Sequence, residues 1–280
     1  MRTVNAKIIT SQVKKIYIEA NTRITPEQTS GLKRALAKET HRLAAKALSQ
    51  IIDNCRIAEA RKMPVCQDTG LPVVFAEIGQ DVRITGGDLN TAINLGLAEA
   101  CLDGYLRQSV VDPLTRKNTQ TNTPAVIYSR IVSGSKIKIT VVPKGFGSEN
   151  MGQVKMLKPA TGVKGVKDFV LAAVKTAGAN PCPPIVVGVG IGGTMDYAAL
   201  LAKEALFEIG GGQRVRDKEL AKLSREILSD INKLRIGPAG LGGVTTALKV
   251  NIKTFPTHIA GLPVAVNIGC WCHRARTIII

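Results

Sequence analysis

The sequence has few aromatic residues and no long hydrophobic run. Only 4% of its 280 residues are Phe, Trp or Tyr, so side chains that stack on nucleobases are scarce. No apolar run approaches the roughly 20 residues of a membrane-spanning helix. The N-terminus, with Arg2, Lys7 and Lys14 among polar residues, lacks the apolar core of a signal peptide. We therefore expect a cytoplasmic protein with no membrane partner.

Acidic residues are also scarce. The chain has 38 Lys and Arg against 21 Asp and Glu, a formal net charge of +17. Such an excess attracts polyanions, anionic substrates or an acidic partner subunit. The basic residues are spread along the whole chain, without a basic arm or an aromatic-rich recognition motif. A basic nucleic-acid-binding protein is therefore only our third hypothesis, and we do not expect nucleic acid as a partner.

The six cysteines show no close C-x-x-C pair. In a chain without export signals they are better explained as thiols or metal ligands than as a disulfide framework. Cys55 and Cys101 lie on apolar helical faces, so we assign both to core packing. Four candidate ligands remain: Cys66, Cys182, Cys270 and Cys272.

The pattern of residues predicts a mixed α/β fold, with a helical N-terminal part over about 1–62 and a mixed part over about 63–280. Thr25 and Pro26 have the form of an N-cap and a first-turn proline, and apolar residues continue with helical spacing as far as Ile52. A buried strand follows over 73–76. Residues 125–132 and 136–142 flank Ser133-Gly134-Ser135, which predicts a hairpin and hence antiparallel pairing.

The stretch richest in reactive groups is Pro64-Val65-Cys66-Gln67-Asp68-Thr69-Gly70, between the helical part and the next strand. Metal binding suits a thiolate at Cys66, proton transfer suits Asp68 and hydrogen bonding suits Gln67. The alternative is an ordinary helix-to-strand turn, since Asp-Thr-Gly is good turn chemistry. Cys182, in a proline-rich segment, and Cys270, after the strand 262–267, favour the first interpretation.

Spacing alone neither proves nor excludes a cluster on these cysteines. Cys66 and Cys182 are 116 positions apart (182 minus 66), and Cys182 and Cys270 are 88 apart (270 minus 182). Three distant ligands suit a catalytic site that leaves one coordination position open, rather than a closed electron-transfer centre.

Three further stretches are candidate binding segments. Residues 108–123 have the composition of a long loop, and Arg107 stands at its entrance, either as an anion ligand or as a solvated helix-end arginine. The glycines of Lys144-Gly-Phe-Gly-Ser-Glu-Asn allow close approach to an anion, although a flexible turn would look the same. Gly188, Gly190 and Gly193 match a dinucleotide-binding template with Glu208 about 20 residues on. The strand and helix alternation of a Rossmann domain is missing downstream, so a nucleotide-dependent enzyme is our second hypothesis.

Several motifs together resemble class I fumarate hydratase and the related L(+)-tartrate dehydratase. They are Pro-Val-Cys66-Gln-Asp-Thr-Gly, Lys144-Gly-Phe-Gly-Ser-Glu-Asn, Cys182-Pro-Pro before Gly-Gly-Thr194, Gly237-Pro-Ala-Gly-Leu-Gly-Gly-Val-Thr-Thr, and Leu262-Pro-Val before Cys270. The chain is most similar to the α subunit of the two-subunit form, because it stops shortly after Cys270, where single-chain relatives continue into a C-terminal domain. The missing domain is expected on a separate β chain.

The resemblance implies an oxygen-sensitive 4Fe-4S hydro-lyase whose cluster is held by Cys66, Cys182 and Cys270, with Cys272 as the alternative third ligand. By similarity, Asp68 serves in proton transfer and Gln67 in substrate binding. Arg107 and the Gly147 region would hold carboxylate oxygens. His258 matches an active-site loop of relatives, although a structural histidine is an equal explanation.

The resemblance also implies a substrate and a partner. The substrate is a C4 dicarboxylate, with fumarate hydration to malate, a step of the tricarboxylic acid cycle, preferred over L(+)-tartrate dehydration. The partner is a β subunit in a hetero-oligomer such as α2β2.

Overall fold

The computed structural model describes residues 1–209 and 218–280, which form two compact units. Unit 1 comprises Met1–Thr25, Asn54–Phe146 and Arg274–Ile280, and unit 2 comprises Pro26–Asp53 and Gly147–His273. The chain passes between them after residues 25, 53, 146 and 273. Each unit has its own hydrophobic core and its own four-stranded sheet. The predicted mixed α/β fold class is confirmed.

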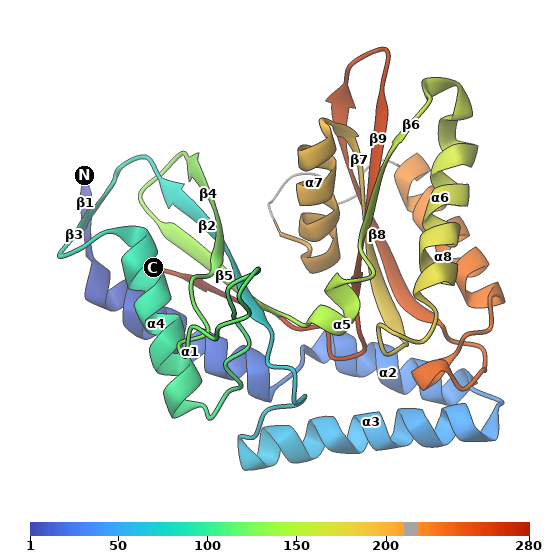
Figure 1. Cartoon of the computed structure of the whole chain (residues 1–280), viewed down its shortest axis with the longest axis horizontal. Helices are drawn as coiled ribbons and strands as arrows, with labels where there is room; N and C mark the ends of the chain where they lie inside the picture. The colour runs from blue at the N-terminus through green and yellow to red at the C-terminus, as the bar shows by residue number, and fades with distance from the viewer. Residues whose placement is uncertain (210–217) are drawn as a thin grey trace. The chain divides into compact units, whose positions relative to one another are not determined.

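Unit 1 is built on a sheet with the strand order β10-β5-β2-β4 (Figure 1). Strand β2 pairs in parallel with β4 and antiparallel with β5, and β10 pairs antiparallel with β5. Helices α1 and α4 pack on each other, and α1 also contacts β5 and β10. The elements are β1 (Arg2–Asn5), α1 (Ala6–Thr22), β2 (Leu71–Gly79), β3 (Val82–Thr85), α4 (Leu89–Asp103), β4 (Val126–Val132), β5 (Ile137–Lys144) and β10 (Arg276–Ile279).

The expected hairpin between residues 125–132 and 136–142 is wrong. Both strands form, as β4 and β5, but β2 lies between them and pairs with each. Five consecutive residues of β2, Pro72 to Ala76, are buried, as in a strand covered on both faces. Alternation in the sequence therefore identified the strands, but it carried no information on which strand would be the neighbour.

The helical region predicted after Thr25 is confirmed and consists of two helices. Helix α2 (Pro26–Lys38) and helix α3 (Arg42–Arg61) are separated at Glu39. The Glu39 carboxylate accepts hydrogen bonds from the backbone N–H groups of Thr40 and His41 and, far along the chain, of Val244. These bonds hold the connection directly before α3, so the chain bends there although the apolar spacing continues.

Unit 2 is built on a sheet with the strand order β6-β9-β7-β8, in which β7 pairs in parallel with β8 and antiparallel with β9 (Figure 1). Its other elements are α2, most of α3, and helices that cover the sheet. The elements beyond α3 are β6 (Gln153–Leu157), α6 (Gly162–Ala177), β7 (Ile185–Gly193), α7 (Met195–Phe207), α8 (Lys218–Lys233), β8 (Ala247–Thr257), β9 (Leu262–Gly269) and the 3₁₀ turns Pro159–Thr161 and Pro238–Gly240. The one-turn helix α5 (Phe146–Glu149) spans the boundary between the units.

Strand β7 presents different side chains to its two faces. Ile185, Val187 and Val189 join the core formed with α6 and α8. The alternate residues Gly188 and Gly190 face α7, and a Cβ on either would lie 2.1 Å from a backbone carbonyl oxygen of that helix. The absence of side chains at these two positions is what lets α7 pack directly on the sheet.

This packing assigns the glycine-rich motif a structural use. Gly188 and Gly190 lie inside a strand, whereas a dinucleotide-binding template requires them in a loop before a helix. Glu208 forms an ion pair with Lys249 at 2.8 Å and caps the end of α7. The strand and helix predicted around the motif are confirmed, but the geometry does not support the nucleotide hypothesis.

We predict that Gly190→Ala destabilises the chain by roughly 1–3 kcal/mol or more, because the added methyl group overlaps the Ala198 carbonyl oxygen and forces α7 away from the sheet. The control is Gly261→Ala, where a Cβ would meet no atom closer than 3.9 Å. Thermal unfolding followed by circular dichroism measures both. Equal melting temperatures for the two variants would contradict the packing argument.

Candidate functional site

The turn that carries Cys66 is held by buried donors from distant parts of unit 1. The Arg274 guanidinium donates to the Asp68 carbonyl at 2.6 Å, and Asn122 Nδ2 donates to the Gly70 carbonyl at 3.1 Å. The Tyr17 hydroxyl donates to the Thr69 carbonyl at 3.3 Å. Arg274 is only 4% exposed, and Asn122 and Tyr17 are fully buried. The turn is therefore held through its backbone carbonyl groups.

The Asp68 carboxylate has a defined orientation. One oxygen accepts from the Gly70 N–H at 3.0 Å, and the other accepts from the Phe146 N–H at 2.9 Å. A Cβ at Gly145 would lie 3.1 Å from the second oxygen, so this glycine lets the backbone approach the carboxylate. The side chain is half-buried. An oriented and partly accessible carboxylate can exchange a proton with a bound molecule.

Gln67 and Arg107 also belong to unit 1, and both are exposed. The Thr69 hydroxyl donates to the Arg107 carbonyl at 3.0 Å, which ties the start of the loop after α4 to the Cys66 turn. The structure thus brings four of the predicted residues into one region of unit 1: Cys66, Gln67, Asp68 and Arg107. An oriented carboxylate, an amide side chain on the same turn and an arginine on the segment tied to that turn are suited to an anionic, hydroxylated substrate.

The loop after Arg107 is ordered by its own hydrogen bonds. Val111 and Asn118 form an antiparallel bridge, and the Asp112 carboxylate accepts from the Thr115 N–H at 2.7 Å. This hydrogen bond from Thr115 is the main reason that the pKa of Asp112 lies below its ordinary value. The buried Asn122 closes the loop by accepting from the Ser109 N–H at 2.8 Å.

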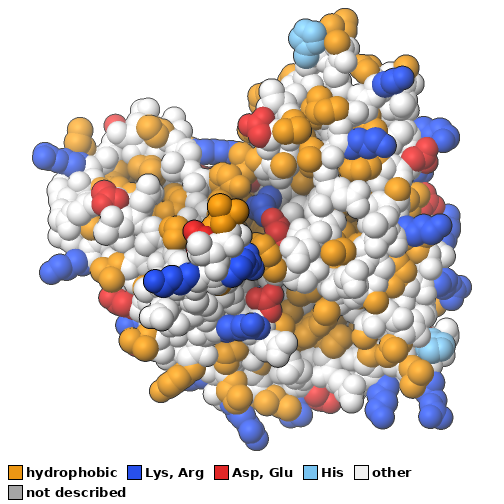
Figure 2. Space-filling model, viewed as in Figure 1, with side chains coloured by type: hydrophobic (Ala, Val, Ile, Leu, Met, Phe, Trp, Pro, Cys, Tyr) orange, Lys and Arg blue, Asp and Glu red, His pale blue; other side chains and the backbone are white. Residues whose placement is uncertain are grey.

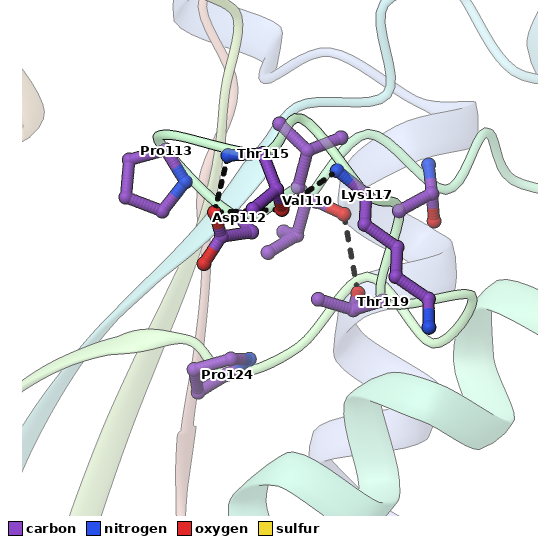
Figure 3. A pocket seen from close by; sticks show the side chains of 9 residues that line it. Val110, Asp112, Pro113, Thr115, Lys117, Thr119 and Pro124 are labelled. Atoms are coloured by element: carbon purple, nitrogen blue, oxygen red, sulfur yellow. Dashed lines mark hydrogen bonds between the residues drawn. The ribbon is translucent and has the colours of Figure 1, made fainter.

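The same loop forms a cavity of about 540 Å³ (Figure 3). Its lining is Val110, Val111, Asp112, Pro113, Thr115, Lys117, Asn118, Thr119 and Pro124. The predicted site residues are absent from this lining, and Asp112 is engaged in holding the loop. We therefore assign the cavity to the shape of the loop and place the candidate site at the Cys66 turn.

In unit 2, Cys182 lies on an exposed turn directly before β7, with a positive φ of 53°. Its carbonyl accepts from the Trp271 N–H at 3.2 Å, so the turns of Cys182 and Cys270 lie side by side. The Ala239 N–H donates to the Pro183 carbonyl at 2.8 Å and supports the turn from the glycine-rich segment 237–243. Two of the predicted ligands therefore belong to one region of unit 2.

Cys270 and Cys272 differ in exposure. Cys270 follows β9 and is half-buried, whereas Cys272 is only 2% exposed. Gln28 of α2 donates to the Trp271 carbonyl between them at 2.8 Å and fixes this turn. The accessible thiol is the one that we predict as a ligand, and the alternative thiol belongs to the interior.

Gly147 lies against the Cys182 turn, because a Cβ on it would be 3.5 Å from the Asn180 carbonyl oxygen. His258 lies elsewhere. It sits on the exposed turn before β9, and its Nδ1 accepts from the Ala260 N–H at 3.2 Å. Cys270 follows the other end of β9, and an eight-residue strand spans roughly 25 Å. The structure therefore does not bring His258 to the Cys182 and Cys270 turns of its own unit.

The donor set suits an iron–sulfur cluster. All six cysteines are thiols, and only Cys66, Cys182 and Cys270 are accessible, each on a turn next to a strand. Cys66 belongs to unit 1 and the other two to unit 2. In the described residues, no three Cys, His, Asp or Glu side chains are grouped closely enough to hold a metal ion. Three accessible thiols have the chemistry that an iron–sulfur cluster requires of its ligands. The structure does not show these three thiols grouped at one place.

The remaining thiols are poor ligands. Cys101 lies in the core of unit 1, and Cys55 is also buried, which confirms the prediction that both are packing residues. Burial raises the pKa of each thiol to about 11. Both thiols are therefore protonated at neutral pH, and the protonated form is not a metal ligand.

Sequence reasoning missed the residues that hold the Cys66 turn. Arg274, Asn122 and Tyr17 contact it across 206, 52 and 52 positions of sequence, respectively. The one available signal was the presence of an arginine soon after Cys270, which could not be told from the many surface arginines. Their contribution depends on burial, which only the tertiary structure shows.

Comparison with known proteins agrees with the resemblance found in the motifs. The family model of fumarate hydratase (Fumerase) matches residues 10–279. A putative L(+)-tartrate dehydratase subunit alpha of Methanocaldococcus jannaschii is 43% identical over 272 residues, covering 95% of each chain. The L(+)-tartrate dehydratase subunit alpha of Escherichia coli K12 is 31% identical over 264 residues, covering 93% of this chain and 86% of its own.

The fold and these similarities define the class of protein as a hydro-lyase, an enzyme that adds or removes water. The chain belongs to the fumarate hydratase family.

We predict an order of thiol reactivity in the iron-free folded chain. Iodoacetamide at about pH 8 should modify Cys182 first and leave Cys55 and Cys101 unmodified, because a pKa of about 11 leaves only about one thiol in 10³ as thiolate. Peptide mass spectrometry over a time course measures each site. Early modification of Cys101 would contradict its place in the core, and the urea-unfolded chain serves as the control in which all six react.

Proposed function

We propose that this chain is the α subunit of an iron–sulfur hydro-lyase that catalyses the reversible hydration or dehydration of a C4 dicarboxylate. The observation that carries the proposal is the division of the thiols: three are accessible on turns and three are buried, in a chain of the fumarate hydratase family. Fumarate hydration and L(+)-tartrate dehydration are the candidate reactions. The names of the relatives favour L(+)-tartrate.

In this proposal a 4Fe-4S cluster is held by Cys66, Cys182 and Cys270. When bound, such a cluster supplies an open iron that acts as a Lewis acid toward a substrate oxygen. Cys270 is preferred over Cys272 because its thiol is accessible. We also propose that residues 1–280, with their two compact units, act as one catalytic iron–sulfur domain in the cytoplasm.

The side chains of the Cys66 turn would handle the substrate. The Asp68 carboxylate, held by the Gly70 and Phe146 N–H groups, has the orientation needed to accept or return a proton. The exposed Arg107 offers a bidentate grip on a carboxylate, and Gln67 offers an amide donor beside it. Near Gly147, the missing side chain leaves space for a substrate oxygen. His258 remains a proposed catalytic residue. It lies before the start of β9, whereas Cys270 follows the end of that strand.

A partner subunit is also part of the proposal. The relatives are named as α subunits, which supports a β subunit and a hetero-oligomer. A charged substrate must be enclosed away from bulk water, and few cationic residues of this chain are assigned to the far carboxylate. The positive charge of the chain can attract the dianion or face the partner.

The other hypotheses have less support. Figure 2 shows Lys and Arg side chains scattered over the visible face among other types, rather than gathered in a groove for nucleic acid. Within the described ranges, no helix is long and apolar enough to cross a membrane. The glycines of the nucleotide template are used in packing α7.

We predict that Cys→Ser at any one of Cys66, Cys182 and Cys270 abolishes cluster retention after anaerobic reconstitution, because serine does not replace a thiolate ligand. Cys55→Ser and Cys101→Ser are the matched controls and should cost only packing energy, on the order of 1 kcal/mol. Iron and acid-labile sulfide analysis measures the result. Full iron in Cys182→Ser, or iron loss in Cys272→Ser but not in Cys270→Ser, would overturn the assignment.

We predict that the reconstituted chain alone has little or no activity and that its β subunit restores turnover. Anaerobic assays with malate, fumarate and L(+)-tartrate, with and without the partner, measure this and identify the substrate. An ordinary enzymatic rate of about 1 to 10³ per second from the chain alone would sink the two-subunit proposal.

A further inference from the structure

A carboxylate in unit 2 joins the segment around Gly147 to the strand that leads to Cys270. Glu149, the last residue of α5, forms an ion pair with Lys203 of α7. Its second oxygen accepts from Asn267 Nδ2 of β9 at 3.0 Å. The side chains of Lys203 and Glu149 are 12% and 26% exposed, and Asn267 is 8% exposed. The contact is therefore shielded from water and is stronger than a surface ion pair.

The segment that bears Glu149 contacts the Cys182 turn on both sides of this carboxylate. Before it, Gly147 lies against the Asn180 carbonyl, 3.5 Å from the position of a Cβ. After it, Met151 Sδ accepts from Asn180 Nδ2 at 3.8 Å. Asn180 is two residues before Cys182. A shift of this segment would therefore displace Asn180 and, with it, the Cys182 turn.

The hydrogen bond between Glu149 and Asn267 connects the same carboxylate to the strand that precedes Cys270. Asn267 lies three residues before Cys270 on β9, and the Glu149 carboxylate holds its amide. The Gly152 N–H donates to the Glu149 carbonyl at 2.9 Å, so the chain turns immediately after α5 and keeps the carboxylate in place. Sequence alone identified the motif around Gly147 as an anion loop or a flexible turn, and left Glu149 without a role.

We infer that Glu149 is a positioning residue for the cluster site, which holds the Gly147 segment, the Cys182 turn and the end of β9 in one arrangement through Lys203 and Asn267. The inference rests on the proposed function, since it concerns the thiols proposed as ligands. Groups that orient metal ligands typically change metal affinity about 10- to 100-fold when they are replaced. Glu149 touches neither substrate nor cluster in this assignment.

The test uses the full chain with Glu149→Gln, which keeps the shape of the side chain but removes its charge. After anaerobic reconstitution, iron release to a chelator is expected to be about 10-fold faster than in the parent chain. The visible circular dichroism of the cluster, which reports the arrangement of its thiolates, is expected to change. In the iron-free chain, iodoacetamide is expected to modify Cys182 faster, with the rate at Cys66 in unit 1 unchanged.

The matched control is Glu226→Gln, which removes the carboxylate of another Lys–Glu pair of unit 2, with Lys167 at 3.1 Å. It should behave like the parent chain in all three measurements. Lys203→Met should reproduce the effect of Glu149→Gln, and the double variant should be no worse than either single one, because both changes break the same contact. Effects on iron release that multiply in the double variant would overturn the pairing.

Two further outcomes are decisive. Iron release, cluster spectrum and Cys182 modification in Glu149→Gln that all match Glu226→Gln would overturn the inference. If the parent chain takes up no iron, the proposed function fails, and the rate of Cys182 modification in the iron-free chain still decides whether Glu149 positions this turn.

Discussion

The hydrogen bond from Arg274 to the Asp68 carbonyl is the contact on which the candidate site of unit 1 depends. A guanidinium that is 4% exposed is costly to bury unless its donors are used, and the backbone of the Cys66 turn uses one of them at 2.6 Å. Arg274, Asn122 and Tyr17 hold the carbonyl groups of the turn, and the Asp68 carboxylate adds a hydrogen bond from the Gly70 N–H within it. Cys66, Gln67 and Asp68 thereby lie on a short and well-held turn, which is how a rigid scaffold positions reactive groups.

In unit 2, close packing that depends on glycine, rather than a buried arginine, holds the segments near the candidate ligands in place. Gly188 and Gly190 let α7 pack on β7, and the consecutive residues Lys203 and Glu204 of that helix each form an ion pair with another element. Lys203 holds Glu149, and Glu204, which is buried, holds Lys253 of β8 at 3.0 Å. Helix α7, which packs closely on the sheet because two side chains are missing, is thus joined to α5 and to β8 by one ion pair each.

The sequence allowed the elements and the reactive turns to be predicted, because both depend on local chemistry. Apolar spacing located the helices, β2 and β9, and thiol, amide and carboxylate in one turn marked Cys66. Which strands pair with each other could not be predicted in the same way. Strands β4 and β5 are adjacent in sequence, yet β2 lies between them in the sheet. The break between α2 and α3 was not located either; there Glu39 accepts from the backbone of Thr40 and His41 and from that of Val244, 205 positions away. The residues behind the site, such as Arg274 and Asn122, act through burial, which no local pattern records.

The path of the chain between the units has a consequence for synthesis on the ribosome. Unit 1 is begun by residues 1–25 and completed by Arg274–Ile280, which supply β10 and the guanidinium behind the Cys66 turn. All of Gly147–His273 is translated in between, so unit 2 can fold while β5 still has an unpaired edge and the Asp68 carbonyl has no arginine. Unit 1 therefore stays incomplete in the nascent chain while Gly147–His273 is synthesised, and the Cys66 turn acquires the hydrogen bond from Arg274 only after that segment has been translated.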